Sequence, residues 1–118
     1  MPHITSNGKD YDCPLQLVME QLGGKWKTPI LWRLKDKTMR YGELRKDILN
    51  ISDRTLTAQL KRLEADGYIS RKVYPVVPPK TEYSLTQQGI EIIELLTSIR
   101  NYGLKMIDKE KMDANTQQ

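Results

Sequence analysis

The chain has 118 residues, a formal net charge of +4 and a single cysteine. This length fits one domain with a modest core. One cysteine excludes an internal disulfide framework, and no stretch reaches the roughly 18 apolar residues of a membrane-spanning helix, so the sequence predicts a cytoplasmic protein with no membrane partner. His3 is the only histidine and lies in a polar segment. We therefore expect no enzyme, no metal and no cofactor.

The positive charge is concentrated in the middle of the chain. Residues 23–86 carry 14 basic and seven acidic side chains, a net charge of +7, whereas residues 1–22 carry −2 and residues 87–118 carry −1. This distribution is typical of a central module that binds a polyanion, with ends that serve another purpose. From charge alone, the expected partner is a polyanion.

Two helices are expected in the first third of the chain. Pro14 suits the first position of a helix, with Cys13 as its N-cap, and Gly23-Gly24 ends that helix. A second helix is predicted at about residues 26–35. Pro29 is tolerated only in a first turn, so the second helix begins close to it.

The third predicted helix ends in a tight turn. A short extended piece at residues 38–40 leads into a helix at about residues 41–49. Asn50 follows where the chain must leave this helix, and asparagine tolerates left-handed backbone. The side chains of this helix that are expected in the core are Leu44, Ile48 and Leu49.

Residues 51–67 are the most informative segment and predict an amphipathic helix, with Ser52 as its N-cap. Leu56, Leu60 and Leu63 recur at i, i+4 and i+7, so they share one stripe that faces a core. The opposite face is basic, hydroxyl-bearing and small, as entry into the DNA major groove requires; the alternative is an ordinary solvated face. The residues expected on the DNA-binding face are Arg54, Thr55, Thr57, Ala58, Lys61 and Arg62.

A β-hairpin is predicted after Gly67. From residue 69 the polar and apolar side chains alternate with a period of two, and three prolines between residues 74 and 80 exclude a helix interior or a central strand there. Residues 69–85 therefore form a hairpin with a stiff tip. Thr86 caps a last long helix over about residues 87–108.

This order of elements is typical of a winged helix-turn-helix, a mainly α fold with a small β-hairpin wing (α+β). The second helix of its turn motif enters the major groove, so Arg54, Thr55 and Ala58 are assigned to base edges, and Lys61 and Arg62 to phosphates. The wing and flanking residues expected to contact double-stranded DNA are Lys72, Tyr74, Lys80, Lys25, Lys27, Arg40 and Tyr41.

The chain resembles the HxlR-type transcriptional regulators, a bacterial group of winged-helix proteins related to the MarR type. Asn50 departs from the family pattern, because many relatives have glycine there. The matching pieces follow the family's order across about residues 13–102; they are residues 13–14, 23–27, 40–44, 51–52, 56–57, 60–67 and 77–86.

The resemblance implies a homodimer on a palindromic operator, with the helices at 14–22 and 87–108 as the interface. The last helix agrees with this, because its apolar surface is too wide for one contact within a monomer; the alternative is a terminal helix that is fully buried in a monomer. Residues 13–108 then form the DNA-binding domain, with a flexible arm at 1–12 and a flexible tail at 109–118.

Cys13 is a candidate sensor. An N-cap lies at the positive end of a helix dipole, which raises the reactivity of a thiol. Several HxlR-type proteins that sense oxidants, quinones or aldehydes use a cysteine in this place, so the resemblance implies a small electrophile or oxidant as signal. The alternative is a Cys-Pro helix start kept for packing. For the whole chain, the alternative is a winged-helix protein-interaction module without DNA binding.

Overall fold

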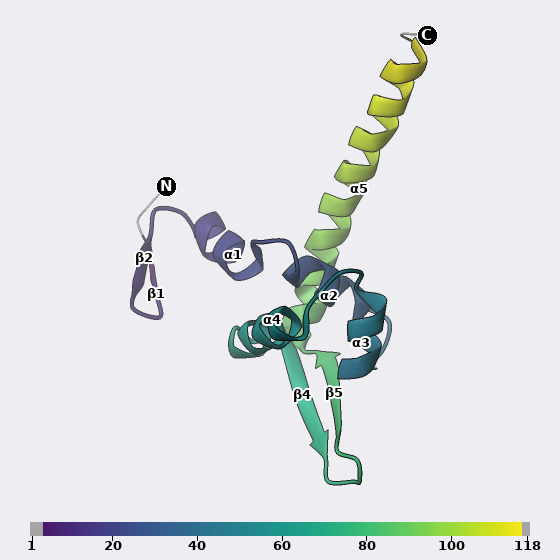
Figure 1. Cartoon of the computed structure of the whole chain (residues 1–118). Helices are drawn as coiled ribbons and strands as arrows, with labels where there is room; N and C mark the ends of the chain where they lie inside the picture. The colour runs from purple at the N-terminus through teal and green to yellow at the C-terminus, as the bar shows by residue number, and fades with distance from the viewer. Residues whose placement is uncertain (1–3, 117–118) are drawn as a thin grey trace.

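The computed structural model of the chain describes residues 4–116 and shows a helical body from which a β-hairpin and one long helix project (Figure 1). The predicted fold class, mainly α with a small hairpin wing, is confirmed. The helices are α1 (Pro14–Leu22), α2 (Lys27–Arg33), α3 (Tyr41–Asp47), α4 (Asp53–Ala65) and α5 (Gln87–Thr116). The strands are β1 (Ile4–Ser6), β2 (Lys9–Tyr11), β3 (Met39–Arg40), β4 (Ile69–Tyr74) and β5 (Lys80–Leu85).

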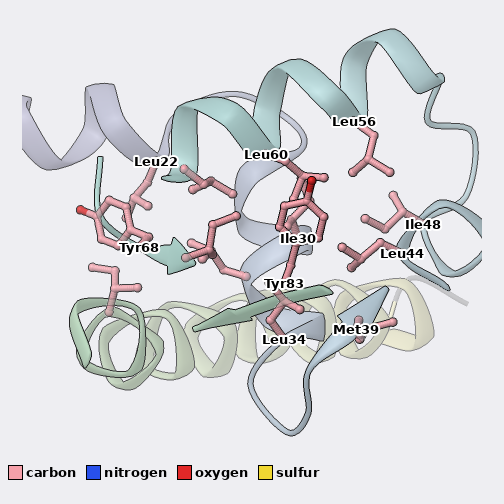
Figure 2. Close-up of a cluster of buried hydrophobic side chains, with 14 of the residues drawn as sticks. Leu22, Ile30, Leu34, Met39, Leu44, Ile48, Leu56, Leu60, Tyr68 and Tyr83 are labelled. Atoms are coloured by element: carbon pink, nitrogen blue, oxygen red, sulfur yellow. The ribbon is translucent and has the colours of Figure 1, made fainter. Parts of the chain in front are cut away.

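The core lies between α2, α3, α4 and the small sheet, and Leu22 of α1 and Ile92 and Leu96 of α5 complete it (Figure 2). Leu56 and Leu60 point from α4 into a cluster that includes Ile30 of α2 and Leu44 of α3. The leucine stripe of α4 is thus buried, as its spacing predicts. The side chains with less than 2% exposure are Ile30, Leu31, Leu44, Leu56, Leu60, Leu63 and Ile69.

The turn between α3 and α4 fixes the direction of α4. Asn50 adopts the predicted left-handed backbone, with a φ of 66°. Ser52 is the N-cap, as predicted, and its hydroxyl accepts a hydrogen bond of 3.1 Å from the Thr55 backbone N–H. The prediction for Leu49 is wrong: its side chain is 79% exposed. The backbone is already extended at Ile48, so the helical spacing that predicted Leu49 no longer applies.

The wing belongs to a three-stranded antiparallel sheet with the order β3-β5-β4. Met39 of β3 pairs with Tyr83 of β5, which joins the wing to the start of α3. β4 and β5 pair from Ile69 opposite Leu85 to Tyr74 opposite Lys80. The proline-rich tip at residues 75–79 joins the two strands of the predicted hairpin and projects away from the body (Figure 1).

Both ends of the chain are more regular than the predicted flexible segments. β1 and β2 pair through a turn in which Asn7 and Gly8 have φ values of 51° and 78°, the conformation of a two-residue hairpin turn. α5 continues to Thr116 because no glycine or proline follows Gly103. Residues 1–3 and 117–118 of the two predicted flexible segments lie outside the described residues.

α1 and α5 leave apolar side chains uncovered. Between α1, α2 and α5 lies a cavity of about 530 Å³, lined in part by Met19, Trp32 and Leu96. Beyond this cavity α5 extends away from the body (Figure 1). The large apolar side chains that α1 and α5 expose include Leu15, Met19, Leu95, Ile99, Tyr102 and Met106.

Candidate DNA-binding surface

α4 carries basic and small side chains on the face opposite its buried leucines. The leucine stripe holds the helix against α2 and α3, so the outer face has a fixed orientation in the body. A rigid helix with a basic, uncrowded face is suited to a groove lined by phosphates. The exposed members of the predicted set are Arg54, Thr57, Ala58, Lys61 and Arg62.

Thr55 differs from the other predicted base-contacting residues. Its side chain is half-buried, and its hydroxyl accepts a hydrogen bond of 2.9 Å from the Ser52 hydroxyl. The Thr55 backbone N–H donates to the same serine oxygen. Thr55 therefore completes the N-cap that starts α4.

A hydrogen-bonded group joins α3 to the first turn of α4. The Tyr41 hydroxyl donates to Oδ1 of Asp53 at 2.9 Å, and Nε of Arg45 donates to the same oxygen at 2.9 Å. The Tyr41 hydroxyl also lies 3.4 Å from Oγ1 of Thr57. These bonds, first that from Tyr41 and then that from Arg45, lower the pKa of Asp53.

Sequence reasoning named Tyr41 but missed Asp53 and Arg45. The available signal was the position of Asp53 in the first turn of α4, next to the predicted base-contacting residues. The pairing with Arg45 depends on how α3 crosses α4, which no spacing within one helix reveals.

A groove of about 610 Å³ lies between the start of α3 and the tip of the wing. Arg40 and Lys80 are the cationic side chains of its lining, and Tyr41 lines it as well. Tyr41 also hydrogen-bonds to Asp53 of α4, so its side chain borders both the groove and the start of that helix. The structure thus brings the predicted flanking residues Arg40 and Tyr41 together with Lys80 of the wing.

Within the wing, Tyr74 lies between two lysines. Nζ of Lys72 is 4.8 Å and Nζ of Lys80 is 4.6 Å from the centre of the Tyr74 ring. Lys80 also pairs with Glu82 at 2.9 Å, and this hydrogen bond lowers the pKa of Glu82. Lys72 is therefore the more exposed cation of the pair, whereas Lys80 is half-buried and partly neutralised.

The structure does not support Lys27 as a DNA-contacting residue. Its side chain is only 5% exposed, and its Nζ donates to the backbone carbonyl of Gln21 at 2.7 Å. Lys27 thereby satisfies a backbone carbonyl near the end of α1. The sequence alone did not distinguish it from the nearby Lys25. Lys25 is exposed, with Nζ 4.7 Å from the centre of the Trp26 ring.

Cys13 is the N-cap of α1, as predicted. Its backbone is extended, with a φ of −155°, and its side chain is half-buried. Cys13 lies between the β1–β2 hairpin and α1, far along the chain from α4. In space, however, the neighbouring residues Tyr11 and Leu17 line a pocket together with Arg62 of α4, so this part of the chain lies beside the last turn of α4.

Comparison with known proteins identifies the family. The model of the HxlR-like helix-turn-helix family matches residues 21–111. The chain belongs to this family of transcriptional regulators. It is 42% identical over 113 residues to the HTH-type transcriptional regulator YdeP of Bacillus subtilis, covering 94% of this chain and 88% of YdeP.

Solved structures of related regulators have the same fold. The redox regulator HypR in its reduced form superposes with a TM-score of 0.78 at 38% identity, covering 81% of this chain and 95% of that one. The reduced form of the Bacillus subtilis regulator YodB superposes with a TM-score of 0.69 at 30% identity, covering 76% and 89%. Sequence and structure therefore agree: the winged helix-turn-helix of this chain is that of transcriptional regulators.

Two other findings concern residues 4–116. None of the helices in this part of the chain combines the length and the hydropathy needed to cross a membrane. In the same residues, no three His, Cys, Asp or Glu side chains are grouped so as to hold a metal ion.

Proposed function

We propose that the chain is a cytoplasmic, homodimeric transcriptional regulator that binds a palindromic DNA operator through α4. The observation that carries this proposal is the division of α4 into a buried leucine stripe and an exposed basic face. Residues near the N-terminus of such a helix reach deepest into the major groove. Arg54, Thr57 and Ala58 therefore face the base edges, and Lys61 and Arg62 bind phosphates.

The wing and its groove extend this contact along the duplex. Arg40 supplies an exposed cation at the groove, and Lys72 supplies another on β4. Tyr74 orients Lys72 and Lys80, which lie on either side of its ring. Tyr41 links the groove to α4. Lys25 adds an exposed cation at the edge of the module, and contacts of this kind set register on DNA more than sequence preference.

The proposed dimer uses α1 and α5. Both helices expose large apolar side chains, among them Met19, Ile99 and Tyr102, and a surface of this kind is typical of a protein-protein interface. In a two-fold dimer on DNA, the two copies of α4 lie about 34 Å apart, one turn of the duplex.

Cys13 is the proposed sensing thiol. The structural neighbour HypR is a redox regulator with both oxidised and reduced forms, which supports redox sensing by this chain. With a quinone, the Cys13 sulfur adds to a ring carbon and the thiol proton passes to the quinone oxygen. An adduct at the start of α1 changes the dimer interface and hence the spacing between the two copies of α4.

Selection of bound duplexes from a random DNA pool tests the proposal, with reduced and with quinone-treated protein at physiological salt. A palindrome enriched only by the reduced form supports both the operator and the thiol switch. The same palindrome enriched by both forms keeps the operator and reduces Cys13 to a helix cap. No enriched site, together with binding that is unchanged as salt rises, favours the protein-interaction module instead, because phosphate contacts release counterions.

A further inference from the structure

Asp53 is an acidic side chain next to the basic residues of the proposed DNA-binding face of α4. It occupies the first turn of α4, one residue before Arg54, and its side chain is 73% exposed. An unneutralised carboxylate at this place would repel phosphates and weaken binding to any DNA. Ser52 already caps α4, so Asp53 is not needed as its N-cap.

The hydrogen bonds of Asp53 leave one of its oxygens available. The side-chain bonds from Tyr41 and Arg45 both end on Oδ1, at 2.9 Å each. They fix the rotation of the carboxylate from the α3 side, so Oδ2 has a defined direction. The side chain is also held ionised, because both bonds lower the pKa of Asp53 and keep it an acceptor at neutral pH.

We propose that Oδ2 of Asp53 accepts a hydrogen bond from the exocyclic amino group of a cytosine in the major groove, which makes Asp53 a specificity-determining residue. This inference rests on the proposed insertion of α4 into the major groove. Cytosine is the base that fits, because it presents an amino donor there without a neighbouring acceptor on the same base. Guanine and thymine present acceptors, and adenine presents the N7 acceptor beside its amino group, so each of them repels the carboxylate.

The substitution Asp53→Asn gives a sharp test. Tyr41 and Arg45 both need an acceptor, so they hold the amide oxygen in the place of Oδ1, and the amide NH₂ takes the place of Oδ2. A donor then faces the base where an acceptor stood. In duplex selection, the wild-type chain should enrich cytosine at one position of each half-site, and Asp53→Asn should replace it by guanine or thymine with all other positions unchanged.

Asp36→Asn is the matched control. Asp36 is exposed, pairs with Lys35 at 2.8 Å and lies between α2 and β3, so its substitution removes the same charge away from α4. Both variants should bind random DNA slightly more tightly than the wild type, and only Asp53→Asn should change the selected sequence. An unchanged cytosine position in Asp53→Asn would overturn the inference while leaving the proposed operator binding intact.

A modified operator tests the same contact without changing the protein. In this duplex a pyrimidine with hydrogen in place of the 4-amino group replaces the selected cytosine. The wild-type chain should lose roughly tenfold in affinity relative to its own operator, whereas Asp53→Asn should bind both duplexes within about twofold of each other. An equal loss for both proteins contradicts the contact, and failure of the wild type to select any site contradicts the proposed function itself.

Discussion

Large apolar side chains are buried in the central module, formed by α2, α3 and α4, but exposed on the terminal helices α1 and α5. In α2, α3 and α4, the leucines and isoleucines of the helical stripes are buried, and the outer surface is basic. In α1 and the outer part of α5, large apolar side chains remain exposed. The central module therefore buries its apolar side chains within one chain, whereas the terminal helices leave an apolar surface uncovered.

This difference separates two requirements of the proposed regulator. Reading DNA needs a rigid helix whose core contacts are made before DNA arrives, and α4 has that rigidity within the monomer. Spacing two such helices needs a second copy, and the apolar surface of α1 and α5 is suited to it. Substitutions on the terminal helices should consequently impair dimerisation, whereas substitutions in the central module should impair folding or DNA recognition.

Ile99→Asp should have the largest effect on operator binding. Ile99 is 58% exposed on α5 and lines the cavity beside α1, so a charge there opposes the proposed dimer without touching the core of the monomer. A monomer binds one half-site, and loss of bivalency lowers operator affinity by roughly 10²–10⁴. Light scattering measures the oligomeric state, and titration with operator DNA measures the affinity.

Asn101→Asp is the control for Ile99→Asp. It adds the same charge on α5 at an exposed polar position. This variant should remain dimeric and bind the operator as the wild type does. A dimeric Ile99→Asp variant with normal operator affinity would place the dimer interface elsewhere.

Leu60→Ala should be the most damaging change within the central module. Leu60 is 1% exposed among Ile30, Leu44 and the other core residues, so its truncation leaves a cavity and lowers the free energy of unfolding by about 2–5 kcal/mol. Urea unfolding measures the loss. Lys61→Ala, one residue further on the exposed face, should change that free energy by less than about 0.5 kcal/mol.

Arg54→Ala should affect recognition but not folding. If Arg54 contacts a base edge, its loss weakens operator binding by roughly 1–3 kcal/mol and relaxes the sequence preference at one base pair. Titration of operator and random duplexes separates the two roles, and Lys105→Ala on α5 controls for the lost charge. Equal weakening on both duplexes would reassign Arg54 to a phosphate.

Much of the fold was predictable because its signals are local. The spacing of Leu56, Leu60 and Leu63, the left-handed Asn50 and the Ser52 cap each act within a few residues, and all three are confirmed. Leu49 was predicted wrongly because the helical spacing was extended past the point where the backbone leaves the helix. The β1–β2 hairpin was missed because three-residue strands give too short an alternation to distinguish from an irregular segment.

The proposed site was less predictable, because contacts between elements decide which charges are available. Lys27 looked like Lys25 in the sequence, yet it is buried against the Gln21 carbonyl. Asp53 looked like an ordinary first-turn acid, yet Tyr41 and Arg45 hold it from another helix. Residue type thus predicts which side chains could bind DNA, whereas the packing of neighbouring elements decides which of these side chains are available to do so.

Glu82→Gln should have the smallest effect, a slight loss of thermal stability that depends on pH. The hydrogen bond from Lys80 lowers the pKa of Glu82 in the folded chain below its ordinary value of 4.5. Stability from this ion pair is therefore complete at neutral pH, and it is lost as the pH falls below 4.5 and through the lowered folded value. Thermal unfolding should show wild type slightly above Glu82→Gln at pH 7, with the two curves converging in acid. A gap that persists in acid would show that Glu82 stabilises the wing without the ion pair, through packing or through its hydrogen bond of 3.1 Å from the Tyr74 hydroxyl.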